Sequence, residues 1–306
     1  MEYTTVGIDV SKAKLDVFFS DTQKAITISN NKDGFKAFYK LITKSYPQIE
    51  RCVIEHTGSY QRELVNFLQA KNIPVSVVSP SKVRNYAKVI GYLAKTDRID
   101  AKLLALFGKQ MQPDLTPQIN PKIVMLRDLI KNRRQFVDNI TLTKQWLEKK
   151  PSAITVKRIN AVIKTLRKQI SEIDAQIKSL IKNEPSFKRK YDTLTKTNGV
   201  GYITAITLLA ELPELGEIQR KKVAALCGIA PMKHESGSLR NKAFIQGGRL
   251  NVRNALYMAT VASLRTNKVI KDYYDRLRAK GKPVKVVVVA CMHKLIIHLN
   301  SLLAQL

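Results

Sequence analysis

Residues 95–101 read KTDRIDA and place two aspartates, Asp97 and Asp100, three positions apart. At that spacing two side chains share one face of a helix, where like charges repel. Either the acids lie at a helix N-terminus, whose dipole favours negative charge, or they bind a metal ion. Two further acids follow apolar runs that are typical of buried strands, namely Asp9 in GIDVSK and Glu55 in RCVIE.

Carboxylates gathered at one point repel one another unless a divalent cation offsets their charge. Mg²⁺ prefers such hard oxygen ligands and leaves room for phosphate oxygens, and Mn²⁺ is its natural substitute. Two such ions can activate an attacking group and stabilise the leaving oxygen of a phosphodiester. Any one of these acids alone is better explained as a turn or helix-start residue. The four together, in this order, favour a metal site.

The elements around these acids indicate the fold that must position them. The pattern predicts strands at 3–9, 14–20 and 24–29, a helix near 35–42, a strand at 51–55, a helix at 60–70, a strand at 74–78, a helix at 81–92 and a last helix with Thr96 as N-cap. Hairpins come first and crossovers later, which predicts a mixed sheet covered by helices. This βββαβαβα order is that of a ribonuclease-H-like α/β fold.

The charge of the chain indicates a polyanionic partner. Lys and Arg number 53 against 24 acids in 306 residues, a net charge of +29. Residues 1–115 hold 17 cations and 11 anions, whereas residues 116–306 hold 36 and 13. An excess of this size on a folded chain is typical of nucleic-acid binding.

The remaining composition favours a cytoplasmic protein without a membrane anchor. The three cysteines are far apart and match no metal or redox spacing, which suits a reducing compartment. No charged-then-apolar leader stands at the N-terminus, so secretion is not expected. The apolar run at 284–292 is too short to span a bilayer.

Prolines between residues 113 and 121 predict a boundary, beyond which two long helical patterns meet at Pro151. The second pattern repeats apolar side chains at alternating spacings of four and three: Ile159, Ile163, Leu166, Ile170, Ile173, Ile177 and Leu180. This heptad seam predicts a coiled coil within or between chains. A helical hairpin packed on its own domain explains it equally well.

Two apolar helical runs near 192–211 are joined by a turn that contains Gly199 and Gly201. Such a helix-hairpin-helix-like element exposes backbone N–H groups at a helix N-terminus, where phosphate binds without sequence preference. The same turn also joins many ordinary helices. Helices over 218–226 and 249–305 complete a mainly α C-terminal region.

Residues 234–249, HESGSLRNKAFIQGGR, predict a flexible basic loop that ends at a helix start. A serine in it is a nucleophile only if a base takes its proton, and only His234 and Glu235 are near. Composition alone therefore favours phosphate binding over catalysis. The residues that we expect to contact nucleic acid here and in GIDVSK are Arg240, Lys242, Gly247, Gly248, Arg249 and Lys12.

Three blocks carry a resemblance to a known family: GIDVSK, E-x-TG-x-Y from Glu55 to Tyr60, and KTD-x-x-DA. They resemble those of the DEDD transposases of the insertion-sequence one-hundred-ten family, whose relatives include the Piv site-specific DNA invertase. The resemblance extends over essentially the whole chain. It implies three domains: a RuvC-like catalytic domain at 1–115, a coiled-coil segment at 116–190 and a transposase domain at 191–306.

The resemblance also implies a nucleophile. These transposases carry an SG…I-x-GG-R element whose serine becomes covalently linked to DNA, and Ser236–Gly237, Ile245 and the Gly247–Arg249 run match it. The role therefore passes to Ser236. Asn241 stands where relatives often have glycine, and Ser238 adds a second hydroxyl.

The partners that the resemblance implies are donor and target DNA, a structured noncoding bridge RNA, and further copies of the chain. In a dimer or tetramer Ser236 would approach the acidic site, from the same subunit or a neighbouring one. The implied setting is the nucleoid of a bacterium or archaeon.

Two other functions remain open on the residues alone. A RuvC-like junction-resolving endonuclease would use the carboxylates with Mg²⁺, and Ser236 would be structural. A basic architectural DNA-binding protein would need neither group. Tyrosine recombination fits poorly, because Tyr60 has no matching Arg/His set around it.

Overall fold

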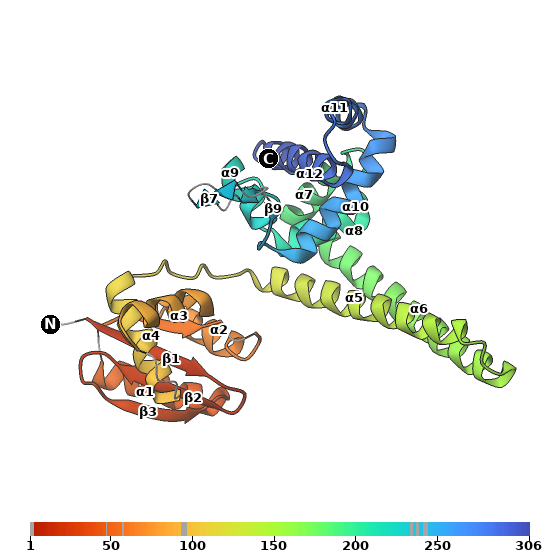
Figure 1. Ribbon diagram of the computed structural model, residues 1–306. Coiled ribbons are helices and arrows are strands. Elements are labelled where there is room, and N and C mark those ends of the chain that lie inside the picture. The colour runs from red at the N-terminus through yellow and green to blue at the C-terminus, as the bar shows by residue number, and fades with distance from the viewer. Residues whose placement is uncertain are drawn as a thin grey trace. The chain divides into compact units, whose positions relative to one another are not determined.

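The structure, a computed structural model, describes residues 3–46, 48–56, 58–92, 97–232, 235–236, 239–240 and 244–306. Within these ranges the side chains of 97–99, 232, 235–236 and 239–240 are not described. The chain divides into two compact units, Met1–Gln118 and Ile119–Leu306 (Figure 1).

The first unit is built on a five-stranded mixed sheet of order β3-β2-β1-β4-β5. Its strands are β1 (Thr4–Val10), β2 (Lys14–Phe19), β3 (Ala25–Ser29), β4 (Ile49–Glu55) and β5 (Val75–Val78). β2 pairs with β1 and β3 in antiparallel fashion, and β4 pairs with β1 and β5 in parallel. The mixed α/β sheet predicted from the sequence is confirmed.

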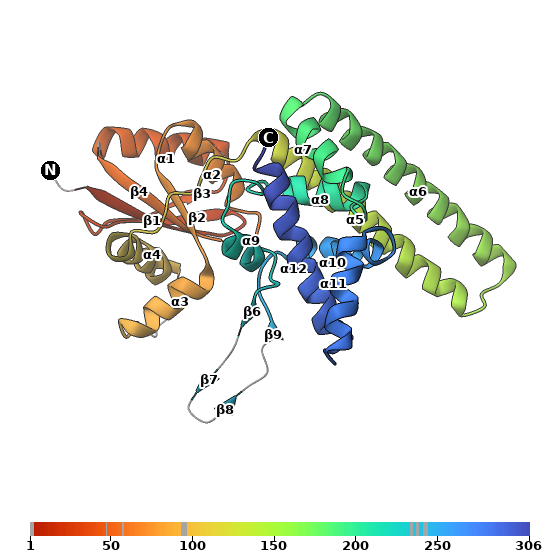
Figure 2. The same cartoon turned by 90° about the horizontal axis from the view of Figure 1, so that it is seen from above.

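Helices cover both faces of this sheet (Figure 2). On one face α1 (Lys32–Ser45) and α2 (Arg62–Ala70) bury Phe35, Phe38 and Leu64 against apolar side chains of β1 and β2. On the other face lie α3 (Pro80–Val89) and α4 (Asp97–Met111), which pack on Val53 of β4. The sheet is therefore buried on both faces, as parallel strands generally are.

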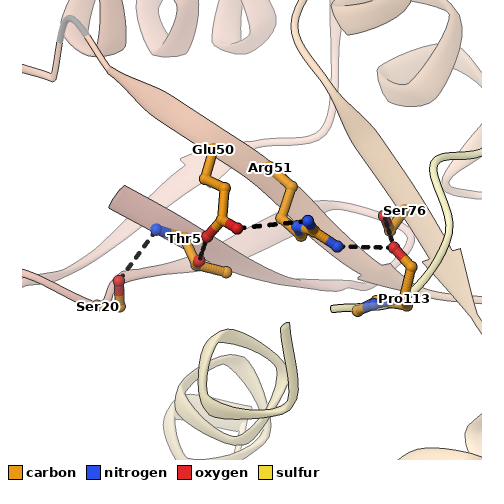
Figure 3. Close-up of polar contacts among 6 residues, drawn as sticks. All are labelled: Thr5, Ser20, Glu50, Arg51, Ser76 and Pro113. Carbon is orange, nitrogen blue, oxygen red and sulfur yellow. Dashed lines mark hydrogen bonds and ion pairs between the residues drawn. The ribbon is translucent and has the colours of Figure 1, made fainter. Parts of the chain in front are cut away.

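A polar network fixes the segment that follows α4 to the sheet (Figure 3). Arg51 of β4 donates through Nη1 to the carbonyl oxygen of Pro113 at 2.8 Å, and Ser76 Oγ donates to the same oxygen at 3.0 Å. Glu50 accepts from Thr5 Oγ1 at 2.9 Å and pairs with Arg51 at 3.3 Å. This network holds the C-terminal end of α4 at the amino end of β1 and β4.

The second unit is helical except for four two-residue strands. Its helices are α5 (Pro121–Glu148), α6 (Ala153–Lys182), α7 (Pro185–Thr195), α8 (Tyr202–Glu211), α9 (Arg220–Leu226), α10 (Leu250–Thr266), α11 (Lys268–Ala279) and α12 (Val284–Leu303). A single apolar core joins them, with α8 and α12 at its centre. The mainly helical C-terminal region predicted from the sequence is confirmed.

The two long helices α5 and α6 lie side by side as a helical hairpin (Figures 1 and 2). The seam residues Ile159, Ile163, Ile173 and Ile177 are buried within the chain. Near the base of the hairpin, Ile173 and Ile177 join the core of the unit together with Leu126. This burial accounts for the heptad pattern without a second chain, and a coiled coil between chains stays a prediction.

The region expected to be a flexible loop contains regular pairing. β6 (Pro231–Met232) pairs with β9 (Phe244–Ile245), and β7 (Glu235–Ser236) pairs with β8 (Leu239–Arg240), each antiparallel. Six of these residues, 235–236, 239–240 and 244–245, fall in the predicted loop at 234–249, and for them the loop prediction is wrong. Strands of two residues are too short to leave an alternating apolar pattern, so periodicity could not have found them.

The apolar run at 284–292 is part of the longer helix α12, which has the length and composition of a membrane span. Half of the most apolar 18-residue stretch of α12 is buried. Cys291, Leu295 and Leu299 lie fully inside the core. A buried core helix passes the same test as a membrane span, and packing explains its apolar character here.

Candidate active site

Asp9 and Glu55 lie at the carboxyl ends of two neighbouring parallel strands. Gly7 of β1 pairs with Val53 of β4, and Ile8 pairs with Ile54. One residue further along both strands, the same register places Asp9 beside Glu55. Both residues are partly exposed, although the strand segments before them are buried.

Both acids also point to the same face of the sheet. Side chains alternate along a strand, so Asp9 shares the face of Gly7, and Glu55 shares that of Val53. A Cβ built on Gly7 would lie 2.0 Å from the carbonyl oxygen of Ala101, and Val53 packs with residues of α4. The face that carries Asp9 and Glu55 is therefore the face covered by α4.

Helix α4 runs antiparallel to β1, so its N-terminal turn approaches the acids. Gly108 contacts Thr5, whereas Ala101 and Ala105 contact Gly7 two residues further along β1. Two more strand residues, roughly 6.6 Å, correspond to about four helical residues. Measured along the axis of α4, Asp9 of β1 therefore lies between the positions of Asp97 and Asp100.

Asp97 is the first residue of α4, four positions before Ala101, and its side chain lies outside the described residues. Asp100 is partly buried. The backbone therefore brings Asp9, Glu55 and the start of α4 to one edge of the sheet. Thr96, the expected N-cap, also lies outside the described residues.

The acids at this edge of the sheet have the chemistry that a divalent cation requires. Asp9, Glu55 and Asp100 offer only hard carboxylate oxygens, the ligands that Mg²⁺ prefers. Among the side chains that the structure describes, no three acids, histidines or cysteines form a group that could hold a metal by themselves. The side chain of Asp97 lies outside the described residues, and the carboxylate oxygens of the other three acids are donors that fit a divalent cation.

A fifth carboxylate, Asp16, was missed in the sequence. It pairs with Asp9 across β1 and β2, so both side chains lie on the α4 face. It is buried, accepts a hydrogen bond from Thr27 Oγ1 at 2.5 Å and pairs with Lys14 Nζ at 3.2 Å. A small cavity of about 10 Å³ separates Asp16 from Ala101. An acid inside the apolar run KLDVFF was the signal that could have found it.

The loops at this edge of the sheet are tied together. Asn30 Nδ2 donates to the carbonyl oxygen of Ser11 at 2.8 Å and to that of Tyr60 at 3.3 Å. The turn after β1 and the loop after β4 are thereby held beside each other. Lys12 is exposed at the tip of the first turn, three residues after Asp9.

Ser236 is the last residue of β7, where it pairs with Leu239 of β8, and Glu235 pairs with Arg240. The antiparallel pairing of β7 and β8 thus forms a hairpin in which Ser236 ends β7, and β7 and β8 lie beyond β6 and β9, away from α12 (Figure 2). The side chains of Ser236 and Arg240 are outside the described residues, as are Ser238 and Lys242 entirely.

The two glycines that follow this hairpin fix its base. Gly248 adopts φ of +67°, and a Cβ on it would lie 2.2 Å from the backbone nitrogen of Gly228. Arg253 Nη1 donates to the carbonyl oxygens of Gly247 at 2.7 Å and Gly228 at 3.2 Å. Because two backbones touch here, a side chain at Gly248 would separate the hairpin from α9.

Arg249 forms a bidentate ion pair inside the second unit. Its Nη1 and Nη2 donate to Glu214 at 2.8 and 2.7 Å, and Nη1 also donates to the carbonyl oxygen of Glu211 at 2.7 Å. Burial raises the pKa of Glu214, but the hydrogen bonds from Arg249 outweigh it and the net pKa is lowered. The guanidinium has a structural role, and phosphate binding by Arg249 stays a prediction.

The two glycines of the α7–α8 turn differ in their surroundings. Gly199 has φ of +95°, and a Cβ on it would lie 2.0 Å from Ser263 Oγ of α10. Its identity is explained by this contact. Gly201 is the N-cap residue of α8 and has no heavy atom within 4 Å of an added Cβ. Only Gly201 therefore leaves open space at this helix N-terminus, where an anion is favoured.

Comparison with known proteins identifies the family of the chain. A family model for DEDD-type transposases, described as "Transposase", matches residues 6–150, and the model "Transposase IS116/IS110/IS902 family" matches residues 191–275. The first span contains all four predicted metal ligands, and the second contains Ser236.

The chain is 30% identical over 305 residues to the pilin gene-inverting protein of Moraxella bovis, covering 97% of this chain and 94% of that protein. The pilin gene-inverting protein of Moraxella lacunata matches with the same identity and coverage. An insertion element IS110 protein of Streptomyces coelicolor is 28% identical over 131 residues, 42% of this chain and 31% of that protein. The chain therefore belongs to the IS110 family of transposases and is a DNA transposase or recombinase.

Proposed function

We propose that the chain cuts and rejoins DNA strands with a carboxylate site formed by Asp9, Glu55, Asp97 and Asp100 on a RuvC-like domain. The observation that carries this proposal is the placement of Asp9 and Glu55 side by side on parallel strands, facing the N-terminal turn of α4. Acids at the carboxyl ends of two adjacent strands and at one helix start contribute little to packing. Their placement at one edge of the sheet supports a catalytic role.

The family implies dependence on a divalent metal, and the carboxylate donors fit Mg²⁺, with Mn²⁺ as a substitute. Such a cation supplies Lewis-acid stabilisation of the phosphodiester and of the leaving oxygen. Asp9 and Glu55 would hold it from the sheet, and Asp97 and Asp100 from the helix. Asp16 would keep Lys14 beside Asp9, which limits the net negative charge at the site.

Ser236 would be the nucleophile. Its Oγ attacks the phosphorus of a DNA phosphodiester, a serine–phosphate ester bond forms, and the phosphorus bond to one sugar oxygen breaks. That oxygen leaves with a proton. Attack by a sugar hydroxyl of a second strand then reverses the step, restores the serine and joins the new strands. A hairpin tip suits this role because it can enter the site of another domain or subunit.

Rejoining distinguishes this function from simple nuclease activity. The relatives that align along nearly the whole chain are named gene-inverting proteins. Inversion of a DNA segment requires that cut ends be joined again, which the covalent serine link provides. A junction-resolving endonuclease would use the carboxylates alone.

The partners would be donor and target DNA and a structured bridge RNA encoded by the insertion sequence. Residues 116–306 carry a net charge of +23, which suits a large nucleic-acid load. A dimer or tetramer would bring Ser236 to the acidic site of the same or a neighbouring subunit. We expect the assembly to act on the nucleoid of a bacterial or archaeal cell.

The experiment is a recombination assay with full-length protein, element-end and target DNA, the flanking noncoding RNA and Mg²⁺. Ser236→Ala should abolish recombinant product and the protein–DNA adduct that survives denaturing electrophoresis, while DNA binding persists. Ser238→Ala is the matched control and should retain both.

The alternatives give different results. Strand cleavage that persists in Ser236→Ala would support the junction-resolving endonuclease. Recombination in Asp9→Asn or Glu55→Gln would remove the carboxylate site from the mechanism. DNA binding without any cleavage in the presence of RNA and metal would support an architectural protein.

A further inference from the structure

The half of the α5–α6 hairpin furthest from the core is strongly basic. We call residues 140–168, the end of α5 and the start of α6 with their connection, the distal arm. It contains eight cations and one acid: Lys144, Lys149, Lys150, Lys157, Arg158, Lys164, Arg167, Lys168 and Glu148. All eight cations are exposed. Figures 1 and 2 show this end of the hairpin projecting from the other helices of the second unit.

Three cations at the base of the same hairpin are neutralised. Arg133 donates to both carboxylate oxygens of Asp174, at 2.8 and 3.2 Å. Arg134 pairs with Glu211 at 3.6 Å, and Lys122 pairs with Glu184. These contacts hold the hairpin on its unit. Acids from α6, α8 and the α6–α7 connection thus offset three cations at the base of the hairpin.

The distal arm has fewer ion pairs than the base. Across residues 140–168, all of which the structure describes, the only ion pair is that of Lys168 with Glu172 at 3.9 Å. The eight cations of the distal arm repel one another. This repulsion lowers the stability of this end of the hairpin, where α5 and α6 pack on each other. Such a concentration of unpaired charge is typical of a surface that meets a polyanion.

Several of these cations line a groove between α5 and α6. Lys144 of α5 and Lys164 and Arg167 of α6 line it, with Leu147 and Ile163 as its apolar wall. The groove encloses about 530 Å³ and is open to solvent. Cations thus stand on both helices around one depression, which allows phosphates to be held from two sides.

A second copy of the chain is a poor occupant of this groove. Two distal arms in contact would bring together eight cations from each, and the chain as a whole carries +29. Repulsion of this kind opposes association, whereas counterion release favours binding to a phosphate backbone. Six of the eight cations are lysines, whose ammonium groups act as point charges and suit phosphate contacts without base specificity.

We propose that the distal arm binds the phosphate backbone of duplex DNA, with Lys144, Lys164 and Arg167 as its central contacts. The inference rests on DNA as the substrate and adds a binding surface distinct from the Ser236 hairpin and the α7–α8 turn. The arm would position the DNA flanking the cleavage site, and its contacts are independent of sequence.

The chain contains a reporter at this surface. Trp146 is its single tryptophan, two residues after Lys144, and its side chain is 60% exposed. Its fluorescence therefore reports occupation of the distal arm and nothing else. Duplex DNA should change the emission of the full-length protein.

The test measures binding of fluorescent duplex DNA over a range of salt concentrations. For B-DNA, the slope of log K against log salt falls by about 0.9 for each phosphate contact that is removed. Lys144→Gln, Lys164→Gln and Arg167→Gln combined should lower the slope by about 2 to 3 and abolish the Trp146 response. The matched control combines Lys32→Gln, Lys40→Gln and Lys44→Gln on α1, which removes the same charge and should preserve the slope and the Trp146 response.

Several results would overturn the inference. An equal loss in both triple variants would mean that only net charge matters. A wild-type Trp146 emission that ignores duplex DNA but responds to single-stranded RNA would assign the arm to RNA. A change in oligomer mass caused by the arm variant would make the arm a subunit contact. Absence of DNA binding in the wild type would instead contradict the proposed function itself.

Discussion

Gly7 of β1 and Ala101 of α4 lie in backbone contact, so close that a Cβ on Gly7 would lie 2.0 Å from the carbonyl oxygen of Ala101. This contact determines how near the start of α4 comes to Asp9. The positions of Asp97 and Asp100, two predicted metal ligands, therefore depend on Gly7 having no side chain. Gly7 lies two residues before Asp9, the third predicted ligand.

Gly7→Ala should displace α4 and reduce catalysis. Overpacking of a tight contact costs about 1–3 kcal/mol, and a shift of about 1 Å in a catalytic group costs roughly 100-fold in rate. Strand cleavage per folded molecule and urea unfolding followed by circular dichroism measure the two effects. Gly34→Ala is the matched control, because its Cβ would meet Ser29 O at 2.0 Å, away from the acids. Equal cleavage rates in the two variants would contradict this prediction.

Asp16→Asn should lower the rate of cleavage with little effect on DNA affinity. The amide can still accept from Thr27 but no longer forms an ion pair with Lys14. Because Lys14 is half-exposed and screened by solvent, the loss of stability should be only about 1 kcal/mol. The rate and the DNA dissociation constant, measured separately, decide the matter. If binding falls and the rate does not, Lys14 and Asp16 serve binding instead.

The Arg249–Glu214 pair should make the second unit sensitive to acid. The folded pKa of Glu214 is lowered from 4.5, so its stabilising effect is present above about that pH and disappears as the pH falls through the folded pKa. Glu214→Gln should therefore destabilise the unit at pH 7 by about 1 kcal/mol, after discounting for partial exposure, and by less near pH 3. Circular dichroism of the helices during urea unfolding at the two pH values measures this difference. A difference that is independent of pH would exclude the ion pair as the cause.

The three cysteines should be unreactive in the folded chain. Burial raises the pKa of the Cys52 and Cys227 thiols to about 12 and that of Cys291 to about 11, so none is a thiolate at neutral pH. A chromogenic disulfide reagent should react with none of them in buffer and with all three in urea. Rapid reaction of the native protein would show that at least one is accessible.

Much of the first unit could be predicted because its strands are apolar runs bounded by turns. The expected strand at 51–55 ends at Glu55, as β4 does. The register between β1 and β4 could not be predicted, because it depends on which residues meet across strands that are 39 or more positions apart. The approach of α4 likewise depends on Gly7 and Gly108, whose role is visible only against their partners.

The candidate site shows the same division. Carboxylates after apolar runs stand out in a sequence, which is how Asp9 and Glu55 were found. Asp16 did not stand out, because its meaning comes from being opposite Asp9 in the hairpin. Arg249 was expected to bind phosphate on the basis of charge alone, and its bidentate pairing with Glu214, 35 residues earlier, could not have been inferred.

The measurement that tests the central claim most directly is Mn²⁺ binding by the full-length protein, followed by electron paramagnetic resonance. We predict that the wild type binds Mn²⁺ and that Asp9→Asn and Glu55→Gln each weaken binding at least about 10-fold, because each removes one ligand. Asp33→Asn, which alters an exposed acid on α1, should bind as the wild type does. Unchanged Mn²⁺ affinity in both Asp9→Asn and Glu55→Gln would contradict a metal site at the ends of β1 and β4.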